Sequence, residues 1–261
     1  MEEKRETVSN GETSNVTPAE NKDVSKAEKP KKTKKTRPIT VKANRKGRHI
    51  MKLLNVLRVI IIPVYYLLRP FKFYGNRKVK DGACVYISNH YGMMDPLYVA
   101  CTTWEGVHYM TQKSAFDVFA LGTILRWVKA IKVNRDGTDV RAVLDCFKCL
   151  KNGEKVAIYP EGTRNKTGGE MLPFRHGAAA IAIKAKVPIV PIVMYEKPRY
   201  FHCTHILIGE PIELTEYYGK KMTEEDFVEA DDKLRTLMIN MRREHTRFLE
   251  DKRTKKEKKV K

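Results

Sequence analysis

Short apolar runs alternate with amphipathic stretches along the middle of the chain. Apolar runs of about four to eight residues predict buried strands, whereas apolar residues repeated every three or four positions predict helices. The predicted strands cover residues 83–87, 107–111, 130–133, 155–159, 188–195 and 206–208. The predicted helices cover residues 121–128, 140–150, 176–186 and 224–247. This alternation indicates an α/β domain in which helices cover a mixed sheet.

The most apolar stretch precedes this domain and covers residues 50–69, IMKLLNVLRVIIIPVYYLLR. A helix that spans a bilayer needs about 20 mostly apolar residues. Here the longest uncharged run covers only residues 59–68 and contains Pro63. An amphipathic helix that lies in the membrane interface is therefore favoured, and a spanning helix and an ordinary core helix are the alternatives.

The patterns divide the chain into four segments. Residues 1–48 lack apolar periodicity and predict a disordered basic tail. Residues 49–78 predict a membrane-associating segment, residues 79–250 a folded domain, and residues 251–261 a second basic tail.

The distribution of charge along the chain indicates an anionic partner. The formal net charge is +20, and most of it lies in the tails, with ten basic residues and no acid in residues 29–48. Such runs need an anionic partner, which is either a membrane surface of anionic headgroups or a nucleic acid; a merely solubilising tail is the alternative. Because no nucleic-acid-binding motif is present, nucleic acid is not expected to be the main partner.

The five cysteines, at positions 84, 101, 146, 149 and 203, are an odd number, and no signal peptide precedes them. Both features predict reduced thiols in a cytosolic compartment. Cys146 and Cys149 form a CxxC pair, but they lie inside a predicted helix and no second ligand pair follows at zinc-finger spacing. Packed helix cysteines are therefore favoured over a redox or zinc site.

A first candidate site, Ser88–Pro96, directly follows the strand at 83–87. It places His90 and Asp95 at the carboxyl end of that strand, where α/β folds gather their functional residues. A carboxylate at one ring nitrogen fixes the tautomer, and the other nitrogen can then take a proton from an attacking hydroxyl. Taken alone, a structural histidine with satisfied hydrogen bonds is the alternative.

A second candidate site, Tyr159–Asn165, follows the strand at 155–159. Gly162 lets backbone amides approach an anion closely, Thr163 offers a hydroxyl donor, and Arg164 offers a bidentate fork suited to phosphate. A tight β-turn without a ligand is the alternative. The GxxxxGK[ST] pattern of a nucleotide P-loop is missing.

Four blocks follow one another in a specific order. They are NHxxxxD at 89–95, an arginine after a short apolar strand at 135, PEGTR at 160–164, and VPIVPI at 187–192. Their order and spacing resemble the four motif blocks of the glycerolipid acyltransferase family, most closely the bacterial-type 1-acylglycerol-3-phosphate acyltransferases. The resemblance covers residues 80–215 and identifies residues 79–250 as an acyltransferase domain.

The resemblance implies a role for each matching residue. His90 is implied to be the general base, and Asp95 orients it. The residues implied to bind the glycerol phosphate are Lys113, Arg135, Glu161, Gly162, Thr163 and Arg164. A basic residue at position 175, before Gly177, also fits the family. His108, His176, His202 and His205 are interpreted as structural or surface residues, and no metal site and no bound cofactor are expected.

The implied reaction transfers a fatty acyl group from acyl-CoA or acyl-[acyl carrier protein] to the sn-2 hydroxyl of lysophosphatidic acid and forms phosphatidic acid for phospholipid synthesis. Direct attack is expected because no GxSxG nucleophile elbow is present. The expected location is the cytoplasmic face of a membrane, as a peripheral or monotopic protein. The alternative acceptors are glycerol 3-phosphate, another lysophospholipid or an amino-acid lipid. A basic nucleic-acid- or membrane-binding protein without catalysis is the alternative from another class.

Overall fold

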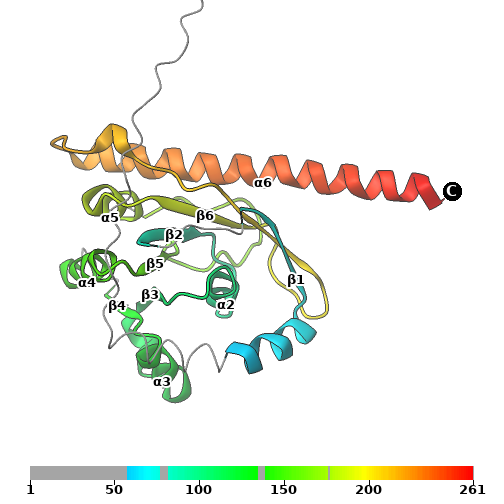
Figure 1. The fold of residues 1–261 in the computed structure, drawn as a ribbon, viewed down its shortest axis with the longest axis horizontal. Helices are drawn as coiled ribbons and strands as arrows, with labels where there is room; N and C mark the ends of the chain where they lie inside the picture. Colours follow the sequence, from blue (N-terminus) through cyan, green and yellow to red (C-terminus); the bar gives the residue numbers. More distant parts are fainter. Residues whose placement is uncertain (1–57, 77–81, 135–138, 176, 261) are drawn as a thin grey trace, which may run out of the picture. The chain divides into compact units, whose positions relative to one another are not determined.

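The computed structural model describes residues 58–76, 82–134, 139–175 and 177–260. In this part of the chain, a seven-stranded sheet has the order β1-β7-β6-β2-β5-β3-β4 (Figure 1). Its strands are β1 (Phe71–Gly75), β2 (Cys84–Ser88), β3 (Val107–Gln112), β4 (Ile131–Val133), β5 (Lys155–Ile158), β6 (Ile189–Met194) and β7 (Thr204–Ile208). The helices are α2 (Asp95–Ala100), α3 (Phe119–Trp127), α4 (Val140–Lys151), α5 (Ala178–Ala185) and α6 (Glu224–Val260), with short 3-10 helices η1 (Lys113–Phe116) and η2 (Thr215–Tyr217). The predicted mixed α/β fold is confirmed.

Five neighbouring strands, β6, β2, β5, β3 and β4, run parallel to one another. Parallel neighbours need long crossover connections, and α2, α3, α4 and α5 each lie in one of these connections. β7 is antiparallel to β6, and β1 pairs parallel to β7, which makes the sheet mixed. Because β2, β5, β3 and β4 run in the same direction, the loops that follow them emerge at one edge of the sheet.

The central strands β2 and β6 are buried along their whole length. Helices cover both faces of the sheet, so these strands are continuously apolar instead of alternating. On one face, Val85 and Ile87 of β2 belong to a core cluster with residues of α4, α5 and α6. On the other face, Tyr86 belongs to a cluster with Tyr98 of α2 and Tyr65.

The sequence did not predict β1, which falls within the range assigned to the membrane-associating segment. Phe71–Gly75 is a five-residue edge strand, and its partner β7 lies far along the chain. A run this short carries no distinctive period of its own, and only the pairing with β7 makes it a strand. In the structure, β1 is thus part of the same sheet as the strands of the predicted domain at 79–250.

At the other end, α6 continues to Val260, past the predicted end at 247 and through most of the predicted basic tail at 251–261. Lysine, glutamate and arginine are good helix formers, so a charged run can extend a helix that the core has already started. The predicted tail at 1–48 and the first part of the apolar stretch, residues 50–57, lie outside the described residues.

Residues 58–68 form a helix with two different sides. On one side Tyr65 is buried, with its ring 5.4 Å from that of Tyr98, and Nη2 of Arg58 donates a hydrogen bond of 2.6 Å to the carbonyl of Thr103. The other side exposes apolar residues: Ile60, Val64 and Leu67 are 64%, 58% and 73% exposed. In the described part of the chain, no helix is both long enough and apolar enough to cross a membrane.

Candidate active site

The loop after β2 is tied to the end of β6 by the side chain of Asn89. Its amide nitrogen donates to the carbonyl of Met194 at 2.9 Å, and its amide oxygen accepts from the Met194 backbone at 2.8 Å. Asn89 is buried, so these two bonds replace the sheet pairing that ends at Ser88. The following residue, His90, therefore leaves the carboxyl edge of the sheet from a fixed position.

His90 and Asp95 are in direct contact. Nδ1 of His90 lies 2.9 Å from Oδ2 of Asp95, and the same oxygen accepts hydrogen bonds from the backbone amides of Tyr91 at 2.6 Å and Gly92 at 2.7 Å. The Asp95 side chain is 1% exposed and that of His90 is 19% exposed. An acceptor at Nδ1 places the proton there, so Nε2 keeps a lone pair for a substrate proton.

The imidazole of His90 is also held from one face. Its ring stacks on that of Tyr159, with 4.3 Å between the ring centres and 27° between the planes. Burial raises the pKa of the Tyr159 hydroxyl well above its ordinary value. Tyr159 thus stays neutral and acts as an apolar wall that limits the rotation of the imidazole.

The loop after β5 holds both backbone groups of His90. The amide of His90 donates to Oε1 of Glu161 at 2.8 Å, and its carbonyl accepts from the amide of Asn165 at 2.7 Å. The other Glu161 oxygen accepts from the amide of Leu172 at 3.0 Å. Burial raises the pKa of Glu161, and the two amide hydrogen bonds oppose that rise.

These contacts give Glu161 a structural place in the site. Its carboxylate is buried, and each oxygen accepts a hydrogen bond from a backbone amide. Glu161 thus joins the two site loops, and the contact with glycerol phosphate that the resemblance implied stays a prediction. The sequence could not reveal this junction, because the partner amides of His90 and Leu172 are identified only by the folded backbone.

Cationic side chains surround the same loop. Gly162 has a φ of +62°, and a Cβ there would collide with the side chain of Arg175, which lies against it. The amide of Arg175 donates to the carbonyl of Pro160 at 2.7 Å, so the chain returns to the loop at this point. The side chains of Thr163, Arg164 and Arg175 are exposed.

Lys113 is the first residue of η1 and directly follows β3, with an exposed side chain. Since β3 is parallel to its neighbour β5, Lys113 lies at the same edge of the sheet as the loop at 160–164. Contacts join His90, Asp95 and Glu161 into one site. Gly162, Thr163, Arg164 and Lys113 occupy the same edge. Arg135 lies outside the described residues.

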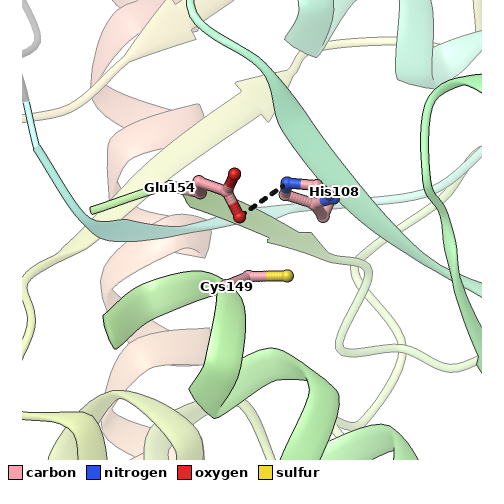
Figure 2. Close-up of side chains that lie close together, drawn as sticks. All are labelled: His108, Cys149 and Glu154. Atoms are coloured by element: carbon pink, nitrogen blue, oxygen red, sulfur yellow. Dashed lines mark ion pairs between the residues drawn. The ribbon is translucent and has the colours of Figure 1, made fainter. Parts of the chain in front are cut away.

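The structure brings together a second group that the sequence interpretation had left apart. The ligand atoms of His108, Cys149 and Glu154 lie within 4.8 Å of one another (Figure 2). The CxxC pair was the available signal, but Cys146 is buried in the core and only Cys149 faces this group. The three residues come from separate elements, and no spacing along the chain connects His108 with the other two.

Comparisons with known proteins concern the sequence and the fold. Residues 70–195 match the family model described as acyltransferase. A 1-acyl-sn-glycerol-3-phosphate acyltransferase of Bacillus subtilis is 29% identical over 62% of this chain and 82% of its own length. The 1-acyl-sn-glycerol-3-phosphate acyltransferase beta of Homo sapiens is 34% identical over 49% of this chain and 50% of its own.

The chloroplastic 1-acyl-sn-glycerol-3-phosphate acyltransferase BAT2 of Brassica napus is 33% identical over 46% of this chain. The chain thus spans about a third of that relative and half of the human one. The crystal structure of the 1-acyl-sn-glycerophosphate acyltransferase PlsC from Thermotoga maritima matches 74% of this chain and 78% of its own with a TM-score of 0.54, at 20% identity. This structural likeness concerns the fold.

The exchange Glu161→Gln tests the junction between the two site loops. An amide group can accept only one of the two backbone hydrogen bonds, and it leaves a buried donor unpaired, so we expect the free energy of unfolding to fall by about 1–3 kcal/mol. Urea unfolding followed by circular dichroism measures the loss. Glu170→Gln, at an exposed position of the same loop, is the matched control and should change stability little. Equal stability of both variants would contradict the junction.

Proposed function

We propose that this chain, whose residues 70–195 match the acyltransferase family model, transfers a fatty acyl group from an acyl thioester to the sn-2 hydroxyl of 1-acylglycerol-3-phosphate. The product is phosphatidic acid, an intermediate of phospholipid synthesis. The names of the relatives from Bacillus subtilis and Homo sapiens support this acceptor. The acyl carrier is coenzyme A or acyl carrier protein, since both present the same thioester.

The contact between His90 and Asp95 is the observation that carries this proposal. Nε2 of His90 removes the proton of the acceptor hydroxyl while the hydroxyl oxygen attacks the thioester carbonyl. The Asp95 carboxylate stabilises the imidazolium that forms and keeps the ring oriented. A general base of this kind contributes about 10²–10⁴-fold to a rate.

Direct attack is favoured over an acyl-enzyme because the buried thiols are poor nucleophiles. Burial raises the pKa of Cys84 and Cys101 to about 11 and that of Cys146 to about 12. At neutral pH these groups are thiols, and the nucleophilic form of cysteine is the thiolate. The acceptor hydroxyl therefore attacks without a covalent protein intermediate, and the thiolate of the carrier leaves.

The exposed cations at the carboxyl edge bind the acceptor phosphate in this proposal. Arg164 and Arg175 present guanidinium groups beside the loop at 160–164, and Lys113 adds an ammonium group. The backbone amides at Gly162 and the hydroxyl of Thr163 can complete the binding, with Arg135 as a further cation. Fixing the phosphate places the hydroxyl near His90, and such positioning contributes several kcal/mol to catalysis (about 7–11 in ideal cases).

A membrane surface is the proposed source of the acceptor, which carries an acyl chain. The helix at 58–68 exposes an apolar side, and α3 begins with a second exposed apolar group, in which Phe119 is 93% exposed. Apolar residues of this kind insert into the interface, while basic segments interact with anionic headgroups. We place the protein on the cytoplasmic face as a peripheral or monotopic enzyme.

The exchange His90→Ala tests the general base. We expect acceptor-dependent thiol release from an acyl thioester to fall by about 10²–10⁴-fold, because no group then takes the hydroxyl proton. The assay compares release with and without 1-acylglycerol-3-phosphate. His202→Ala, at an exposed position, is the control and should retain full activity. Undiminished release by His90→Ala would refute the role of the His90–Asp95 pair, the dyad of this site.

The exchange Arg164→Ala tests the phosphate site. We expect the KM for the acceptor to rise about 10–100-fold with little change in the KM for the thioester, since one charged hydrogen bond of about 1.5–3 kcal/mol is lost. Lys166→Ala, an exposed cation two residues away, is the control. A matched rise in both KM values would argue against a specific phosphate contact.

The double exchange Ile60→Ser with Leu67→Ser tests membrane docking. Each aliphatic side chain contributes about 1.5–3 kcal/mol when fully buried, so binding to vesicles of phosphatidylglycerol and phosphatidylcholine should weaken at least about 10-fold. Sedimentation with the vesicles measures the change. Leu144→Ser, at an exposed position of α4, should bind as the wild type does. Unchanged sedimentation of the double variant would remove the helix at 58–68 from the docking surface.

A further inference from the structure

The group of His108, Cys149 and Glu154 lies at the edge of the sheet opposite the dyad. His108 is the second residue of β3, and Glu154 immediately precedes β5, so both side chains lie where these parallel strands begin. Cys149 is in the last turn of α4. Figure 2 shows the carboxylate of Glu154 facing the imidazole of His108, with the Cys149 sulfur beside them.

The turn between α4 and β5 holds Cys149 and Glu154 side by side. The amide of Glu154 donates to the carbonyl of Cys149 at 3.0 Å, and the amide of Gly153 donates to that of Leu150 at 3.0 Å. These bonds form a Schellman motif, in which the residue after the helix end adopts a left-handed conformation. Gly153 has a φ of +80°, which glycine adopts without strain. The backbone therefore presets two of the three side chains.

The imidazole of His108, the third side chain, is held in place through its Nδ1 atom. Nδ1 of His108 lies 3.0 Å from the carbonyl of Lys129 and donates its proton there, since a carbonyl can only accept. This bond leaves Nε2 available to hold a second partner, which is either a proton or a metal ion. Histidine ligands of metals are typically held in this way, by a backbone carbonyl at the nitrogen that does not bind the ion.

Nε2 of His108 faces a carboxylate. His108 is 2% exposed, and Nε2 lies 3.2 Å from Oε2 of Glu154, a charged contact without ideal hydrogen-bond geometry. A deprotonated Nε2 and a carboxylate oxygen are both acceptors and repel each other at this distance. A cation therefore lies between them, and it is either a proton on Nε2 or a metal ion.

We propose that His108, Cys149 and Glu154 bind a divalent cation of the zinc type. Zinc takes thiolate, imidazole and carboxylate ligands at about 2.0–2.3 Å, and a tetrahedral arrangement then separates the ligand atoms by roughly 3.3–3.7 Å. The spacing of 3.2 Å between His108 and Glu154 already suits this geometry, and all three ligand atoms lie within 4.8 Å. Rotation of the Cys149 side chain brings its sulfur from this distance to the tetrahedral spacing.

The chemistry of the ligand set selects the kind of ion. A thiolate ligand favours zinc over magnesium and calcium, which prefer oxygen ligands throughout. Cys149 and Glu154 are partly exposed, so an ion can enter from solvent and a water can take the fourth position. Because the ligands come from β3, α4 and the turn before β5, the ion would cross-link three elements away from the dyad.

A proton occupies this position when the ion is absent. Burial lowers the pKa of His108, but the nearby thiol of Cys149 and carboxylate of Glu154 outweigh burial and raise it to about 10. Binding of zinc therefore displaces the imidazolium proton and the thiol proton into solvent. The ion and the proton are alternative occupants, and spectroscopy of a bound metal distinguishes them.

Titration of the reduced, metal-free full chain with Co²⁺ tests the proposal. Cobalt takes the place of zinc and reports sulfur ligation through a thiolate-to-cobalt charge-transfer band. We expect one Co²⁺ per chain, the charge-transfer band, and loss of the band when Zn²⁺ is added. Zn²⁺ should also raise the Tm of the wild type. No band with Co²⁺ in excess would overturn the proposal and leave the proton as the occupant.

Variants assign the ligands without reference to acyl transfer. Cys149→Ser should abolish the band, and Glu154→Gln should weaken binding by at least about 10–100-fold, the loss typical of even a supporting contact. Cys203→Ser, an exposed cysteine elsewhere, is the matched control and should retain both band and affinity. Wild-type affinity and a full band in Cys149→Ser would refute the site. The outcome is independent of whether the chain transfers acyl groups.

Discussion

The buried carboxylate of Glu161 joins the two loops that form the candidate active site. One oxygen accepts from the amide of His90 and the other from the amide of Leu172. The amide of Asn165 closes the junction by donating to the carbonyl of His90. His90 thus has both backbone groups bound by the loop at 160–165, and neither loop can shift without breaking a buried hydrogen bond. In this arrangement the distance between His90 and the cations of that loop is set by the backbone.

The rest of the fold supports this junction. β2 and β5 are adjacent and parallel, so the loops after them leave the same edge, and Asn89 extends the connection to β6. The His90 side chain is held as well: Asp95 contacts its Nδ1 atom, and Tyr159 stacks against one face of its ring. Rigid strands therefore place the imidazole of His90, while the arginine and lysine side chains at the same edge are exposed to solvent.

The two edges of the parallel strands have different chemistry. The carboxyl edge collects the dyad and the cations of the proposed acyl transfer, whereas the amino edge collects a histidine, a thiol and a carboxylate. The first contains the blocks at 89–95 and 160–164 that resemble the acyltransferase family. The second depends on a helix-terminating turn at Gly153 and on the carbonyl of Lys129. An ion at the second edge would stiffen the strand β5, whose far end carries the loop at 160–164.

Features that depend on neighbouring residues could be predicted from the sequence. The apolar runs and periods located six of the seven strands, and the spacing of His90 and Asp95 was sufficient for a dyad because five residues can fold back within one turn. Other features appear only in the folded structure, because they need a particular partner far along the chain. β1 is a strand only because β7 pairs with it, and Glu161 is a junction only because the amides of His90 and Leu172 reach it. His108 meets Cys149 and Glu154 only because β3 lies beside β5, and such contacts between distant residues carry no periodic signal in the sequence.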